Sequence, residues 1–131
     1  MSNLKRLVGR RVASIEECYW RSEELTLLDY VTLTCVGGDT IVFRVGSTAE
    51  DVDLIDYAEF ENELKEREPS MFSRSVVTDG LVWSRLIDNE ILDVLVKDEK
   101  GYGHSSVVLF TSRGPTEVTT NAEDALEIIL P

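Results

Sequence analysis

Residues 25–45 read LTLLDYVTLTCVGGDTIVFRV, and this stretch decides the fold class. Apolar and polar residues alternate within 25–36 and again within 40–45, which is the pattern of strands that bury one face. The two runs flank Gly37-Gly38-Asp39, a turn sequence typical of a β-hairpin. An antiparallel sheet is therefore expected at the centre of the fold.

The remaining sequence extends this pattern on both sides of the hairpin. Strand-like runs cover residues 11–20, 52–55, 86–96, 104–111, 116–120 and 126–130, the last being either a strand or a helix begun at Asn121. Helical patterns cover residues 4–8, ended by Gly9, residues 56–67, ended by Pro69, and a short turn from Thr78 or Asp79 to Trp83. A helix that begins at Asp51 is the alternative for the middle segment. We expect an α+β fold made mainly of antiparallel sheet.

The two halves of the chain resemble each other. Leu7-Val8 with Arg11 matches Leu81-Val82 with Arg85, and two further pairs of short motifs follow at separations near 74. Those pairs are 48–51 with 121–124, and 53–55 with 127–129. This similarity predicts one domain, 1–131, with an internal duplication of units 1–56 and 78–131 joined by residues 57–77. Each unit would then be an antiparallel β unit with a short helix, covering the apolar face of the other.

The charge of the chain restricts its partners. It has 131 residues, a common size for one domain, and a formal net charge of −12. A field of this sign repels nucleic-acid phosphates and anionic lipid, and it attracts basic proteins. We expect no nucleic-acid or membrane binding. Solubility is the alternative explanation of the charge.

The two cysteines and the first residues indicate the compartment. Cys18 and Cys35 lie in apolar stretches with no CxxC spacing, so two buried free thiols in a reducing compartment are expected. A bridge between neighbouring strands is the alternative for an exported protein. No apolar run follows the basic residues of the N-terminal segment, and no run is long enough to span a bilayer. A cytoplasmic location is the simplest expectation.

No catalytic or metal-binding set stands out, so the expectation is a non-enzyme without cofactor. His104 is the one candidate base, beside Ser105 and Ser106, but no nucleophile-elbow glycines surround it. A zinc site would need more cysteine and histidine ligands, and Asp51-Val52-Asp53 lacks the remainder of a calcium loop. No single pair of carboxylates is marked for glycosidase chemistry.

One segment is more acidic than the rest of the chain. Residues 50–68 hold nine carboxylates against Lys65 and Arg67, interleaved with Tyr57, Phe60 and Leu64. The segment is either a solvated helix face with a core-facing edge or a docking surface for a basic partner, on which aromatics anchor and carboxylates steer. The predicted contact residues are Asp53, Asp56, Tyr57, Glu59, Phe60, Glu61 and Glu63.

In its size, acidity, β content and this acidic-aromatic segment, the chain resembles the immunity proteins of bacterial toxin systems and small bacterial families of unknown function. The resemblance implies a cytoplasmic, non-catalytic protein that occludes a basic toxin domain. A homo-oligomeric structural or accessory protein that pairs its edge strands is the second hypothesis. A small hydrolase that uses His104 is the third.

Overall fold

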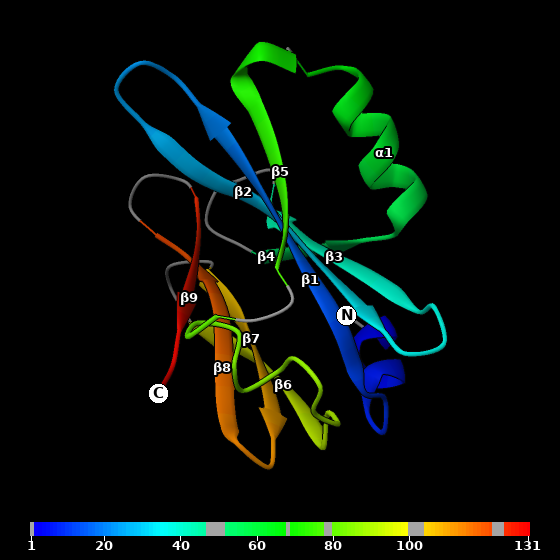
Figure 1. Cartoon of the computed structure of the whole chain (residues 1–131). Helices are drawn as coiled ribbons and strands as arrows, with labels where there is room; N and C mark the ends of the chain where they lie inside the picture. Colours follow the sequence, from blue (N-terminus) through cyan, green and yellow to red (C-terminus); the bar gives the residue numbers. More distant parts are fainter. Residues whose placement is uncertain (1, 47–51, 68, 78–79, 100–103, 122–124) are drawn as a thin grey trace.

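Strands dominate the computed structural model, which describes residues 2–46, 52–67, 69–77, 80–99, 104–121 and 125–131. The strands form two antiparallel sheets that face each other, and the helix α1 (Tyr57–Lys65) lies on the outer side of the first sheet (Figure 1). The expected α+β fold made mainly of antiparallel sheet is confirmed.

The first sheet has five strands in the order β4-β3-β2-β1-β5. Their bounds are β1 Val12–Arg21, β2 Thr26–Cys35, β3 Thr40–Val45, β4 Val52–Ile55 and β5 Phe72–Val77. The predicted hairpin is β2–β3, and its turn contains Gly37 and Gly38, both with a φ of 101° that favours glycine. A 3-10 helix, η1 (Ser2–Leu7), precedes β1, and a second, η2 (Pro69–Met71), precedes β5.

The second sheet has four strands in the order β6-β7-β8-β9. Their bounds are β6 Asp93–Glu99, β7 His104–Thr111, β8 Gly114–Thr120 and β9 Leu126–Ile129. The last segment is therefore a strand, the first of the two alternatives. Both sheets contain a run of four consecutive antiparallel strands, β1 to β4 in one and β6 to β9 in the other.

The alternation within the strands divides the apolar residues between two clusters. Val31 and Leu33 of β2 point between the sheets, where they join Val107 and Leu109 of β7 in the main core. The intervening residues of β2 point to the outer side, where Tyr30 packs against α1 in a smaller cluster with Cys18, Val42, Ile55 and Phe60. One face of the first sheet thus meets the second sheet, and the opposite face holds the helix.

Two sequence predictions of strands need correction. The strand β5 was not expected, because SRSVV lacks a clear alternation, yet it pairs with β1 from Ile15 to Trp20. The expected strand at 86–96 begins only at Asp93. Residues 88–91 before it pair with 9–12 instead, and the positive φ of Asp88, 66°, interrupts the extended run.

The segments 9–12 and 88–91 are joined by reciprocal hydrogen bonds. Gly9 N donates to Ile91 O (2.8 Å) and Asp88 N donates to Val12 O (2.9 Å). Ile91 N donates to Arg10 O (2.8 Å) and Val12 N donates to Asn89 O (3.0 Å). The bridge between Arg11 and Glu90 lies at the centre of this pattern. Exchanging the two segments leaves the pattern unchanged, so a local two-fold axis relates them.

The two leucines matched in the sequence, Leu7 and Leu81, differ in burial. Leu7 is fully buried, whereas Leu81 is 88% exposed. Leu4 and Leu7 correspond in burial to Trp83 and Leu86, which lie in the same core cluster. The matched motifs at 48–51 and 121–124 lie largely outside the described residues. The duplication itself stays a prediction.

Two further predictions concern chain segments before and between the sheets. The expected short helix at 4–8 is the 3-10 helix η1, and Gly9 follows it with a φ of 87°. The turn expected from Thr78 or Asp79 begins outside the described residues. None of the helices in the described part of the chain is long and apolar enough to cross a membrane.

Candidate functional site

The helix α1 and the strand before it carry the predicted contact residues. Asp56 is the N-cap, and its Oδ1 accepts a hydrogen bond from Glu59 N (2.8 Å), so the alternative start at Asp51 does not apply. Phe60 is fully buried and meets the Tyr30 ring edge-on, with ring centroids 5.1 Å apart. An apolar edge formed by Phe60 and Leu64 therefore fixes the helix on the sheet.

Arg44 of β3 binds two of the predicted carboxylates. Its Nη1 donates to Glu63 Oε2, and its Nη2 lies 3.3 Å from Asp53 Oδ2. Tyr30 Oη donates to the other oxygen of Glu63 (2.7 Å). Burial alone would lower the pKa of Arg44, but the hydrogen bonds and negative charges of Glu63 and Asp53 raise it. Burial, followed by the hydrogen bond to Glu63, raises the pKa of Tyr30 to about 12.

Arg74 of β5 binds a third predicted carboxylate, that of Glu61. Its Nε and Nη2 donate to the two oxygens of Glu16 (3.1 and 2.9 Å), and its Nη1 lies 3.2 Å from Glu61 Oε1. The guanidinium carbon lies 5.2 Å from the centroid of the Phe60 ring, and Nη2 also donates to Tyr57 Oη (3.2 Å). The hydrogen bonds that Arg74 donates to Glu16 are the chief cause of its raised pKa. The two arginines thus connect α1 to the first sheet, Arg44 through Glu63 and Arg74 through Glu61.

The predicted contact residues thus divide into two groups. Asp53, Glu61 and Glu63 form ion pairs within the molecule, and Phe60 is inside it. A partner cannot contact Phe60 without displacing the helix, so the buried position does not fit its predicted role as an anchor. Asp56, Tyr57 and Glu59 remain exposed at the start of α1. Within the described residues, neither Asp56 nor Glu59 has a cation within ion-pair distance.

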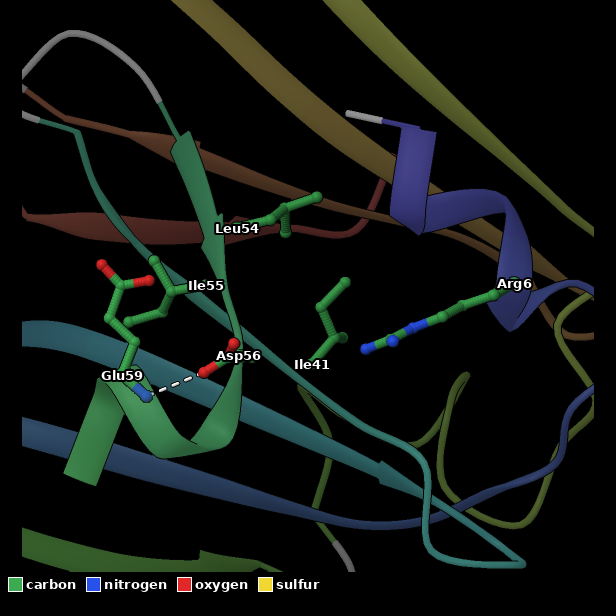
Figure 2. A pocket seen from close by; sticks show the side chains of 6 residues that line it. All are labelled: Arg6, Ile41, Leu54, Ile55, Asp56 and Glu59. Carbon is green, nitrogen blue, oxygen red and sulfur yellow. Dashed lines mark hydrogen bonds between the residues drawn. The ribbon is translucent and has the colours of Figure 1, made fainter. Parts of the chain in front are cut away.

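A hollow of 310 Å³ opens beside these exposed residues. We call it the Arg6 hollow; its lining residues are Arg6, Ile41, Leu54, Ile55, Asp56 and Glu59. Figure 2 shows the Arg6 side chain reaching in from η1 toward Ile41 and Asp56, with Leu54 to one side and with Ile55 and Glu59 beyond Asp56. Arg6 Nη2 donates to Thr40 O (2.9 Å). The hollow offers a cationic wall, an anionic wall and an apolar floor.

Sequence reasoning missed Arg6, Arg44 and Arg74. For Arg44 a signal existed: in TIVFRV it alternates with Phe43 and Val45, so it had to point away from the core. The register Arg44↔Asp53 then depends on the pairing of β3 with β4. For Arg6 and Arg74 no such signal was present, because their partners come from elements distant in sequence.

The two cysteines lie on opposite sides of the first sheet. Cys18 packs beneath α1 and Cys35 packs between the sheets, and both are free thiols. A bridge between them, the alternative expected for an exported protein, is therefore wrong. Burial, with the nearby Glu16 charge, raises the pKa of Cys18 to about 12, and burial raises that of Cys35. Neither thiol is suited to act as a nucleophile.

The third hypothesis is a small hydrolase that uses His104. The side chain of His104 lies outside the described part of the chain, so this hypothesis stays a prediction. Ser106, which shares a face of β7 with His104, is buried. Among the residues that the structure describes, no group of three or more histidine, cysteine, aspartate or glutamate side chains could hold a metal ion.

Comparison of the chain with protein-family models, with curated proteins and with solved structures gives no match. What the geometry defines is a two-sheet, mainly antiparallel α+β protein with a helix on one outer face.

Proposed function

We propose that the chain is a non-catalytic protein-binding module that neutralises a basic partner in the manner of an immunity protein. The observation that carries the proposal is the exposed start of α1. There, Asp56 and Glu59 have no cation partner among the described residues, and they flank a hollow with an apolar floor. A net charge of −12 would speed the approach of a basic protein.

The proposed surface is smaller than the whole acidic segment. Asp53, Glu61 and Glu63 are half-exposed or less and already compensated by arginines, so they would serve mainly to hold α1 in place. Asp56 and Glu59 would contact the partner, with Tyr57 (42% exposed) as the adjacent aromatic group.

The experiment uses two charge-matched double variants. Asp56→Asn with Glu59→Gln removes two charges at the hollow, and Asn keeps the N-cap. Glu23→Gln with Glu24→Gln removes two exposed charges from the turn between β1 and β2. The tagged chain is used to capture proteins from its native host at low salt, and the captured protein's own activity is assayed with and without one equivalent of pure chain.

The proposal expects a basic partner whose activity falls when the chain is added. Its association should slow as salt rises, because long-range attraction is screened. The hollow variant should lose capture and inhibition, and the turn variant should keep both. A captured partner that is indifferent to the hollow variant, or whose activity the chain leaves intact, would contradict the proposal.

A homo-oligomer is the second candidate, and the outer face of the second sheet favours it. Leu95, Val108, Glu117 and Ile129 form one row across β6 to β9. Leu95 and Ile129 at its two ends are 46% and 40% exposed, Val108 is buried, and Glu117 pairs with Lys97. Sedimentation of the pure chain across a hundredfold concentration range tests it. A monomer at all concentrations would exclude this candidate.

We also propose that the chain contains two copies of one β unit. The common strand order, the reciprocal bonds between 9–12 and 88–91, and the matching burial of Leu33 with Leu109 support it. The connecting segment, α1 with η2 and β5, would then be the part added to one copy.

A further inference from the structure

Arg6 and Arg85 occupy corresponding places in the two halves. Each precedes a fully buried leucine, Leu7 or Leu86. Arg6 Nη2 donates to Thr40 O at the start of β3 (2.9 Å), and Arg85 Nη1 donates to Pro115 O at the start of β8 (2.8 Å). Since β3 and β8 are the third strands of the two four-strand runs, the two guanidinium groups reach the same point of each sheet.

Among the described residues, Arg85 binds one backbone oxygen more than Arg6 does. Its Nη1 also donates to Pro131 O (2.9 Å), beyond the end of β9. The strand corresponding to β9 in the first half is β4, and the chain after β4 turns at Asp56 into α1. Among the described residues, Arg85 therefore has a second backbone acceptor, Pro131 O. At the corresponding place beside Arg6 lies the hollow.

The Arg6 hollow has the size and chemistry for one residue of another chain. Its 310 Å³ corresponds to the space of roughly ten water molecules at about 30 Å³ each. A guanidinium has five N–H donors, so Arg6 can donate to a further carbonyl besides that of Thr40. Asp56 and Glu59, which carry the opposite charge, line the hollow on the side away from Arg6, and Ile41 lies between Arg6 and Asp56.

We propose that the Arg6 hollow binds a lysine or arginine residue in an extended segment of the partner protein. Arg6 donates to the backbone carbonyl of that residue, as Arg85 donates to the Pro115 carbonyl. The aliphatic stem of the residue lies over the apolar floor, and its cationic end pairs with Asp56 and Glu59. This inference rests on the proposed function and specifies the contact within it.

The test compares two probes of equal charge that differ in backbone. One is an N-acetylated, C-amidated pentapeptide, Lys-Gly-Lys-Gly-Lys, and the other is spermidine, which carries three positive charges and no carbonyl. Affinities are measured by calorimetry at low salt for the wild type, Arg6→Gln and the control Arg21→Gln. Arg21 is exposed and is the last residue of β1. Each of the two substitutions removes one positive charge, so the two variants have the same net charge.

We expect the wild type to bind the peptide more tightly than spermidine. Arg6→Gln should weaken peptide binding by about tenfold or more, the effect of losing one charge-assisted hydrogen bond. Spermidine binding should not weaken, because the variant is more negative overall. Arg21→Gln should weaken neither probe. Urea unfolding of each variant verifies that the fold is kept.

Two outcomes overturn the inference while leaving the proposed function distinguishable. If Arg6→Gln leaves the peptide affinity unchanged, or if the wild type binds both probes equally, the carbonyl contact does not exist. If in the same series Asp56→Asn with Glu59→Gln still abolishes capture of the basic partner, the proposed function survives that result. If the peptide depends on Arg6 but the partner is indifferent to the carboxylates, the proposed function fails and the peptide site remains.

Discussion

Gly9 and Asp88 both have positive φ, and they occupy corresponding positions in the paired segments 9–12 and 88–91. Their φ angles are 87° and 66°, and each donates its N–H into the other's segment, Gly9 to Ile91 O and Asp88 to Val12 O. Among the described residues, Asp88 is the only non-glycine with positive φ. The reciprocal hydrogen bonds hold both backbones at positive φ. The surrounding structure, more than the residue type, therefore imposes this conformation.

Substitutions at Gly9 and at Asp88 should destabilise the protein in the same rank order of residue types. Gly9→Asn should cost less than about 1 kcal/mol, because asparagine tolerates the left-handed region and no atom lies within 4 Å of a Cβ at Gly9. Gly9→Val should cost about 2 kcal/mol, since a β-branched residue is strained there. Asp88→Gly should be near neutral and Asp88→Val destabilising by a similar amount. Urea unfolding measures all four.

Equal stability of the asparagine and valine variants would contradict this explanation. A loss at Gly9 without a loss at Asp88 would count against treating the two segments as copies, because the backbone constraint would then not be shared.

Sequence patterns predicted the bounds of those strands and helices whose local pattern agrees with their tertiary environment. The alternation in TIVFRV predicted β3 with its bounds, and the helical spacing with Pro69 as the stop placed α1 within two residues at its C-terminal end. It failed where a segment's partner is remote. Residues 88–91 read as strand, but their pairing with 9–12 could not be inferred from either segment alone.

Glu63→Gln should destabilise the protein by about 1–3 kcal/mol. The substitution leaves the partly buried Arg44 guanidinium with Asp53 as its remaining carboxylate, at 3.3 Å. Glu66→Gln is the control, since Glu66 is exposed at the C-terminal end of α1, where a negative charge is not favoured. The control should change the free energy of unfolding by less than about 0.5 kcal/mol. Equal effects of the two variants would mean that the Arg44 pair does not hold the helix.

The candidate site was only partly accessible to sequence reasoning. Composition marked residues 50–68, but it could not separate carboxylates that bind arginines of the sheet from those left exposed. That separation depends on where Arg44 and Arg74 emerge, which is set by strand register. The helical spacing of Tyr57, Phe60 and Leu64 was compatible with a core-facing edge, and Phe60 does belong to it.

Phe60→Ala should cost about 3–5 kcal/mol, because it empties a fully buried site against Tyr30 and removes the ring beneath Arg74. Tyr57→Ala, which removes a partly exposed ring from the same helix, should cost distinctly less. Far-UV circular dichroism during urea unfolding compares the two. Stability of the Phe60 variant close to that of the wild type would show that α1 does not depend on this contact.

Two substitutions of Asp56 should separate the stabilisation by its N-cap hydrogen bond from the stabilisation by its charge. Asp56→Ala removes the acceptor of Glu59 N and should cost about 1 kcal/mol, whereas Asp56→Asn should change stability by a few tenths of a kcal/mol. Thermal unfolding measures both. If the asparagine variant were as unstable as the alanine variant, the carboxylate charge, and not the hydrogen bond, would stabilise the helix start.

Alkaline pH should destabilise the wild type more steeply than Cys18→Ala. The pKa of Cys18 is raised from 9.0 to about 12 in the folded protein, so above pH 9 the unfolded chain releases a proton that the folded chain retains. The free energy of unfolding then falls with rising pH, by up to about 1.4 kcal/mol per pH unit for this one group, and the contribution is fully present below pH 9. Tyr19 and Tyr30, whose pKa values are also raised to about 12, act equally in both proteins and cancel. Urea unfolding between pH 8 and 11 gives the two slopes; parallel slopes would mean that the thiol ionises in the folded state as readily as in the unfolded one.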